Sequence, residues 1–189
     1  MQDAEKMSLD KLADWPSPKK TKLILYFSIA LYIIIYPILG YYFAASNYPV
    51  SFIESQLSFS GEVIKSHHRT MNSEELNLYR IAQLIDYIYM IAYGTLYFSL
   101  SLYIARKFDE ISKWRESGYY IASFGLSSSI CDGIENIFIL LMLTNPLGFP
   151  DIWAIIHSCF ALVKFILIGI IYVWIISAVI SLIFKRKSS

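Results

Sequence analysis

The sequence predicts an all-α polytopic membrane protein: a four-transmembrane-helix antiparallel bundle with an interfacial helix between the first two spans. Hydrophobic residues make up 56% of the 189 residues and charged residues only 16%, and the mean hydropathy is +0.49. Four apolar stretches are each long enough to cross a hydrocarbon core of about 30 Å as a helix. Most Lys and Arg residues fall in segments that share one side of such a bundle.

The four predicted spans cover residues 23–45, 81–105, 118–143 and 152–184. Together they form one transmembrane domain, residues 23–184, between an N-terminal tail, residues 1–22, and a basic C-terminal tail, residues 185–189. The N-terminal tail is polar, contains acidic residues and lacks the compact apolar segment of a cleaved signal peptide. We therefore expect the first span to remain in the mature protein.

The long connection between spans 1 and 2 carries the prediction of an interfacial helix. Its apolar residues recur at partly helical spacing: Phe52, Ile53, Leu57, Phe59, Val63 and Ile64. A short helix lying at the outer membrane surface fits this pattern. Asn72 followed by Glu75 resembles a capping box, so span 2 is expected to begin as a helix outside the lipid.

Basic residues indicate the orientation of the bundle. Of the 16 Lys and Arg residues, five lie in the N-terminal tail, four between spans 2 and 3, and three after span 4. Short segments rich in Lys and Arg stay on the cytoplasmic side. Both termini are therefore predicted to be cytoplasmic, in an integral membrane protein whose membrane the sequence does not specify.

Span 3 contains an unusual group of polar residues for a lipid-embedded helix. Asp132 and Glu135 lie one turn apart, with Asn136 beside them. Each charged side chain near the bilayer centre costs about 2.5–3.5 kcal/mol on insertion scales. At about 1.5 Å per residue, Asp132 and Lys164 of span 4 reach nearly equal depth, so these two residues are expected to pair.

Ionisable residues of the other spans share the same outer half of the membrane. Asp86 lies near the start of span 2 and His157 near the start of span 4, and Tyr87, Tyr93 and Tyr97 are predicted to share the face of Asp86. The predicted ligand-binding or charge network comprises Asp86, Asp132, Glu135, Asn136, His157, Lys164, Tyr87 and Tyr93.

Two interpretations of this network stay open. In the structural one, Lys164 neutralises Asp132 or Glu135, Arg80 or His157 covers Asp86, and the network only fixes how the helices dock. In the functional one, three carboxylates meet one deep fixed cation, so one carboxyl is protonated or faces water in a cavity. Such a carboxyl is what a proton relay, a cation site or an acid/base catalyst requires.

Several classes of chemistry are disfavoured. The sequence has no Gly-rich phosphate loop, no Ser/His/Asp set and no Cys/His spacing typical of a zinc site, which argues against nucleotide, hydrolase and metal chemistry. No metal, no cofactor and no nucleic-acid partner is expected. Whether the protein is an enzyme stays open.

Part of the pattern resembles other membrane proteins. A carboxylate early in span 2, D-x-x-E-N at Asp132–Asn136 and Lys164 in the next span resemble a set of small, uncharacterised four-span proteins, a resemblance that implies no activity. In layout, with four spans, cytoplasmic ends and a long first outer connection, the chain is similar to the EXPERA group, which includes sterol isomerases. This similarity implies carboxylates in a lipid-accessible intramembrane pocket.

The favoured function is binding of a small hydrophobic or amphipathic, lipid-like ligand in an outer-half polar pocket. The alternatives are a non-catalytic assembly or scaffold protein with a structural charge network, and a small proton- or cation-coupled carrier. A carrier is disfavoured because no inverted repeat is present. Expected partners are membrane lipid and the lipid-like molecule, with a homodimer left open.

Overall fold

The computed structural model describes residues 12–187, so the tail residues 1–11 and 188–189 lie outside the described part. About 83% of the residues are helical, and no strand occurs in the described range. In chain order the helices are α2 (Pro18–Ala45), α3 (Phe52–Gln56), α4 (Gly61–Thr70), α5 (Ser73–Ala105), α6 (Lys113–Met142) and α7 (Asp151–Lys187). By length and composition, α2, α5, α6 and α7 could each cross a membrane.

The long helices begin earlier than the predicted spans. α2 starts at Pro18, inside the predicted N-terminal tail, because Ser17 caps the helix and Pro suits its first position. α5 starts at Ser73 and not at residue 81. The capping box between Asn72 and Glu75 is present, which confirms that part of the prediction. α7 continues to Lys187, so the first residues of the predicted basic tail are helical.

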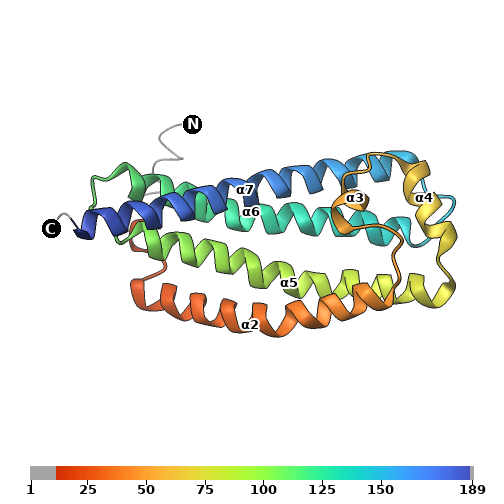
Figure 1. The fold of residues 1–189 in the computed structure, drawn as a ribbon, viewed down its shortest axis with the longest axis horizontal. Helices are drawn as coiled ribbons and strands as arrows, with labels where there is room; N and C mark the ends of the chain where they lie inside the picture. The colour runs from red at the N-terminus through yellow and green to blue at the C-terminus, as the bar shows by residue number, and fades with distance from the viewer. Residues whose placement is uncertain (1–11, 188–189) are drawn as a thin grey trace.

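The long helices pack in chain order (Figure 1). α5 lies between α2 and α6, and α6 packs against α7. Polar contacts tie the neighbours together: Ser28 and Thr95 hydroxyls lie 2.8 Å apart between α2 and α5, and Trp174 Nε1 donates to Ser117 Oγ at 2.9 Å between α7 and α6. Two ends result. We call the end with α3 and α4 the cap end, and the end where α2 begins and α7 ends the terminal end.

Small residues let α5 and α6 approach closely. A Cβ atom added at Gly125 would lie 2.8 Å from the backbone nitrogen of Phe98, and one added at Gly94 would overlap Ser129. Ser129 Oγ donates to the Met90 carbonyl at 2.8 Å across the same contact. The close approach at Gly94 and Gly125 brings the polar faces of the two helices together.

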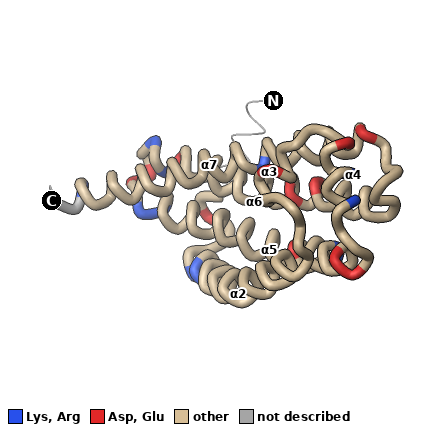
Figure 2. Tube along the Cα trace, turned by 45° about the vertical axis from the view of Figure 1, so that its right-hand side comes forward, with Lys and Arg blue, Asp and Glu red and all other residues tan. Residues whose placement is uncertain are grey.

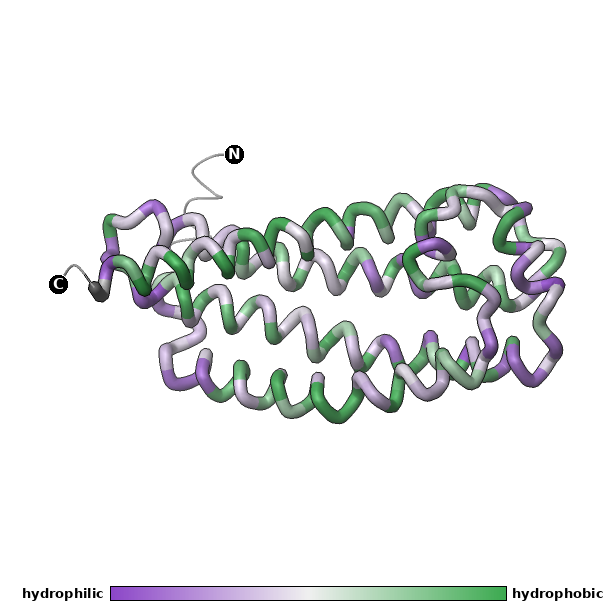
Figure 3. Tube along the Cα trace, viewed as in Figure 1, coloured by the Kyte–Doolittle hydropathy of each residue, from purple (hydrophilic) through white to green (hydrophobic). Residues whose placement is uncertain are grey.

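Apolar side chains fill the space between the helices in two clusters. The larger one lies toward the terminal end and includes Tyr97, Leu102, Ile171 and Trp174, whereas the smaller one lies under α4 at the cap end. Hydrophobic residues recur along the whole length of the long helices (Figure 3), and many of the large ones are exposed. Ile137 of α6 and Ile166 of α7, for example, are about half exposed.

The connection after α2 forms two short helices where one was predicted. Ser51 caps α3 and Ser60 caps α4, and the turn between them includes Phe59 at a φ of 51°. The Phe59 N–H donates to Ser158 Oγ of α7 at 3.1 Å. This contact ties the turn to α7 and directs α3 back over the helices.

His68 of α4 is buried at the cap end. The imidazole is 2% exposed, its Nδ1 lies 3.2 Å from the Pro146 carbonyl, and the rings of Tyr48, Tyr79 and Phe149 surround it. Burial lowers the pKa of His68 below its usual value, and the neighbouring His67 adds to this effect.

We expect acidification to destabilise the cap end through His68. The folded state disfavours the charged imidazole, so its stabilising contribution is complete above the unfolded pKa of about 6.5 and declines as the pH falls below it. Thermal unfolding in detergent between pH 7.5 and 5 should show a smaller pH slope for His68→Gln than for the unmodified protein. His67→Gln is the control and should change the slope less. Equal slopes for the His68 variant and the unmodified protein would contradict the assignment.

Candidate functional site

Lys164 is the centre of a buried charge network. Its Nζ lies 2.8 Å from Asp132 Oδ1 and 2.5 Å from Glu135 Oε2. Lys164, Asp132 and Glu135 are 5%, 4% and 0% exposed. The predicted meeting of these three side chains is confirmed. One cation of α7 thus compensates two carboxylates that stand on adjacent turns of one face of α6.

A tyrosine of α5 fixes the second oxygen of Asp132. Tyr93 OH donates to Asp132 Oδ2 at 2.8 Å and lies 3.3 Å from the Ser128 carbonyl. Both oxygens of Asp132 therefore have partners, one on α7 and one on α5. Because each partner comes from a different helix, the carboxylate holds three helices in register.

Asp86 is the carboxylate without a cation. Asn136 Nδ2 donates to Asp86 Oδ2 at 2.6 Å, and Asp86 has no ion pair with any residue in the range 12–187. The expectation that Arg80 or His157 covers Asp86 is wrong. Arg80 donates to the Leu143 carbonyl at 2.8 Å, and His157 Nδ1 lies 3.9 Å from Glu135 Oε1. Arg80 is one and a half turns before Asp86 and reaches toward the end of α6, where unsatisfied carbonyls attract it.

A cavity of about 330 Å³ lies beside this network. Asp86, Asp132 and Lys164 contribute its charged surface, and the rest is mostly apolar or aromatic. The other lining residues come from α2, α3, α5 and α7: Tyr36, Leu39, Gly40, Phe43, Phe52, Ile53, Gln56, Tyr89 and Phe165. All four long helices and α3 therefore contribute to one cavity.

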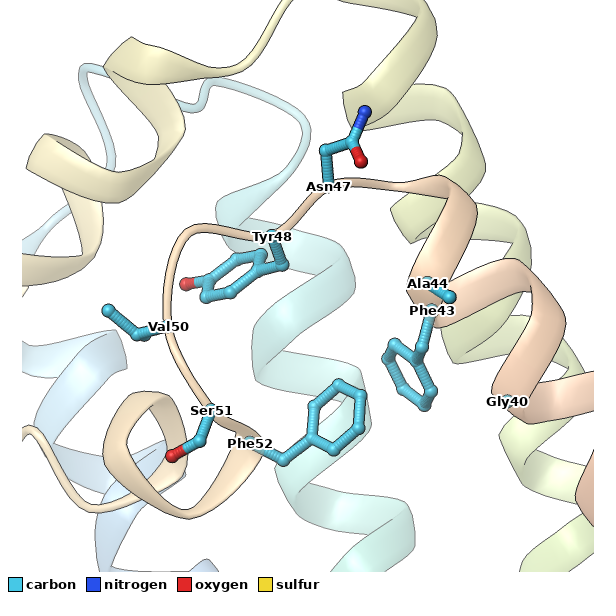
Figure 4. Close-up of a pocket in the computed structure, with 8 residues that line it drawn as sticks. All are labelled: Gly40, Phe43, Ala44, Asn47, Tyr48, Val50, Ser51 and Phe52. Carbon is cyan, nitrogen blue, oxygen red and sulfur yellow. The ribbon is translucent and has the colours of Figure 1, made fainter.

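A second pocket of about 590 Å³ adjoins the cavity at the cap end (Figure 4). Gly40, Phe43 and Phe52 line both spaces. Phe43 of α2 and Phe52 of α3 face each other with ring centroids 4.2 Å apart, as Figure 4 shows. This aromatic pair stands between the second pocket and the charged cavity.

The tyrosines that line the cavity differ from the predicted ones. Tyr87 OH donates to the Gly133 carbonyl at 3.2 Å, and Tyr93 OH donates to Asp132. Neither tyrosine is among the residues that line the cavity. Tyr36 and Tyr89 form the wall instead. Tyr89 was detectable because it lies three residues after Asp86 and shares its face. Gln56, 3.4 Å from Lys164 Nζ, gave no sequence signal because it comes from a folded connection.

Several buried polar atoms of the site are available for further hydrogen bonds. Glu135 Oε1, Asn136 Oδ1, His157 Nδ1 and Gln83 Oε1 have no hydrogen-bond partner in the structure. The carboxylate and amide oxygens are acceptors, so the site has more acceptors than donors. None of these four residues is among those that line the cavity of about 330 Å³. Within residues 12–187 no group of three or more His, Cys, Asp or Glu side chains is placed to hold a metal ion.

No protein-family model, curated protein or solved structure matches the chain. The resemblance to four-span proteins with D-x-x-E-N, and the similarity of layout to the EXPERA group, therefore stay predictions. Any assignment of function depends on the geometry of the network and the cavity.

Proposed function

We propose that the four long helices form an antiparallel bundle across a membrane, with both termini in the cytoplasm and α3 and α4 at the outer interface. Pairs of contacts support the antiparallel arrangement, because early residues of one helix meet late residues of the next. The pairs are Ser28 with Thr95, Phe43 with Tyr79, Asp86 with Asn136, Arg80 with Leu143, Lys164 with Asp132, and Trp174 with Ser117. Basic residues gather at the terminal end (Figure 2), which supports the orientation.

The bundle binds a small amphipathic ligand in the cavity next to Lys164. The main support is that one cavity of about 330 Å³ is lined by charged side chains on one side and by aromatic and aliphatic side chains elsewhere. Ligand pockets have this composition, with mostly apolar surface and a few convergent polar groups. α2 and α7 both line the cavity but do not pack closely against each other, so we expect a ligand dissolved in the bilayer to enter between these two helices.

The polar end of the ligand is a hydrogen-bond donor, a hydroxyl or an ammonium group. Lys164 is already occupied by Asp132 and Glu135, and Asp86 faces the cavity with only Asn136 as a partner. A donor placed against Asp86 would satisfy a buried carboxylate that now lacks a cation, whereas a carboxylate ligand would add a fourth negative charge. The apolar body of the ligand would lie against Phe43, Phe52 and Tyr89.

A scaffold function is the second candidate, and one observation favours it. The ion pairs of Lys164 are short and buried and join α6 to α7 without any guest. A carrier has less support. The apolar cluster with Tyr97, Leu102 and Ile171 packs the bundle between the cavity and the terminal end, and an alternating-access path would have to cross it.

Asp86→Asn is expected to weaken ligand binding at least tenfold while leaving thermal stability unchanged or raised. The substitution keeps the size of the side chain and the contact to Asn136, and it removes a buried charge that has no cation. Lipids that copurify with each protein, identified and counted by mass spectrometry, provide the measurement. Glu74→Gln, the same change of charge in the exposed first turn of α5, is the matched control.

Three probes with one alkyl chain separate the ligand classes: dodecylamine, dodecanol and dodecanoate. We expect the amine and the alcohol to bind the unmodified protein and to lose affinity in Asp86→Asn, and dodecanoate to bind most weakly. Equal binding of all three probes would show that the charged side chains lining the cavity do not select the ligand. Unchanged binding in Asp86→Asn, with stability also unchanged, would favour the scaffold function.

A further inference from the structure

Another pocket, basic in character, lies at the terminal end of the molecule, far from the charged cavity. Its volume is about 220 Å³, and it is formed where α2 begins and α5 ends. Six residues line it: Pro18, Thr21, Lys22, Tyr103, Arg106 and Lys107. Three of these six are cations and none is acidic. Figure 2 shows the blue Lys and Arg positions at this end of the bundle.

Within the described part of the chain, no ion pair neutralises the cations of this pocket. Within the range 12–187, none of Lys22, Arg106 and Lys107 has a carboxylate oxygen within 4 Å. Asp14 acts on Arg106 from a greater distance and does not line the pocket. A pocket that gathers three unneutralised cations is an electrostatic site for an anion.

Arg106 is held in place by neutral groups. Its two terminal nitrogens donate at 2.8 Å to Thr21 Oγ1 and to the Leu12 carbonyl, which fixes the guanidinium at the pocket without cancelling its charge. Lys107 Nζ lies 4.9 Å from the ring centre of Tyr103, a position that also keeps its charge at the pocket. The first turn of α2, which begins at Pro18, adds the positive end of the helix dipole.

We propose that this pocket binds the phosphate group of an anionic phospholipid. Phosphate is among the anions that clusters of Arg and Lys at a helix N-terminus bind. Basic pockets between membrane helices on the cytoplasmic side are typical sites for anionic lipid headgroups. The proposal rests on the proposed orientation, with the terminal end at the cytoplasmic surface, but not on ligand binding in the separate cavity.

The surface beside the pocket favours a lipid over free phosphate. On α2, directly after Lys22, the side chains of Leu23, Tyr26 and Phe27 are 69%, 66% and 64% exposed. Acyl chains attached to a phosphate in the pocket would run along these side chains. Free phosphate would leave this apolar surface without a partner, so the headgroup and the apolar surface together fit one lipid molecule.

The test compares lipid binding in two double variants. Delipidated protein is placed in nanodiscs of neutral phosphatidylcholine containing a few per cent of phosphatidylglycerol, and bound lipid is counted by native mass spectrometry. Each cation at an anionic surface strengthens binding by roughly fivefold, so Lys22→Gln with Lys107→Gln should weaken phosphatidylglycerol binding by roughly thirtyfold. Lys113→Gln with Lys19→Gln removes two exposed cations of the same end outside the pocket and should weaken it less than threefold.

Further arms identify the anion. Inorganic phosphate added to neutral nanodiscs should bind far more weakly than phosphatidylglycerol. A fatty acid present at the same mole fraction as phosphatidylglycerol should not displace bound phosphatidylglycerol from the pocket. Equal losses in the two double variants would overturn the site. Inorganic phosphate that binds as tightly as the phospholipid would overturn its assignment to a lipid. Both pocket lysines are on the surface, so the variants keep Arg106 and its contacts and should unfold at the temperature of the unmodified protein.

Discussion

Replacing Lys164 with Met is expected to destabilise the protein by about 3–5 kcal/mol, the usual cost of removing one partner from a buried ion pair. Lys164 is 5% exposed and compensates Asp132 and Glu135 at 2.8 and 2.5 Å, so its loss leaves two carboxylates buried and close together. Thermal or chemical unfolding in detergent measures the change. Lys113→Met, at an exposed position, removes the same side chain and should shift stability by less than about 0.5 kcal/mol.

Two further variants separate structure from function in this network. Asp132→Asn with Glu135→Gln leaves Lys164 as the uncompensated charge and should also destabilise. The triple change removes every charge of the set and should recover most of the stability, because a buried pair is often no better than neutral residues. Lipid copurifying with the triple variant then distinguishes the functions. Recovery of stability with loss of lipid supports ligand binding, and recovery of both supports the scaffold. A harmless Lys164→Met would show that the pairing is wrong.

Gly125→Ala is expected to destabilise the bundle by about 1–3 kcal/mol, even though Ala favours a helix more than Gly does. The added Cβ would lie 2.8 Å from the backbone nitrogen of Phe98, and a backbone atom cannot rotate away as the end of a side chain can. α5 and α6 would have to separate, which also lengthens the contact between Asp86 and Asn136.

Gly169→Ala is the matched control for this prediction. Gly169 is also in a long helix, but a Cβ there would meet no atom within 4 Å. Only the helix propensity changes, so we expect a gain of up to about 1 kcal/mol. Unfolding of both variants under the same conditions measures the difference. A loss of equal size at both positions would show that the α5–α6 contact is looser than the structure indicates.

The long helices and the central charge network could be predicted from the sequence. The rise of 1.5 Å per residue placed Asp132 and Lys164 at one depth by counts from opposite ends of their helices, and the cost of an unpaired charge in lipid requires them to meet. The capping box at Asn72 could also be identified, because it depends on two residues three positions apart. These predictions depend on local geometry or on large energies.

The cavity walls were harder to predict, because they depend on how helices rotate and how a connection folds. Helical spacing predicted Tyr87 and Tyr93 near Asp86 and did not predict Tyr89. Only tertiary packing decides that Tyr89 lines the cavity while Tyr93 donates a hydrogen bond to Asp132. Gln56 and Phe52 belong to a five-residue helix whose position depends on contacts with α2 and α7. Helices of this length are not stable on their own, so their sequence carries little signal.

The placement of Lys164 on the last long helix has a consequence for biosynthesis. A ribosome releases α6 before α7, so Asp132 and Glu135 reach the insertion machinery before their cation has been translated. Each unpaired charge opposes entry into lipid by about 2.5–3.5 kcal/mol. We therefore expect stable integration of α6 to wait for α7, so that the two helices complete insertion together as a hairpin.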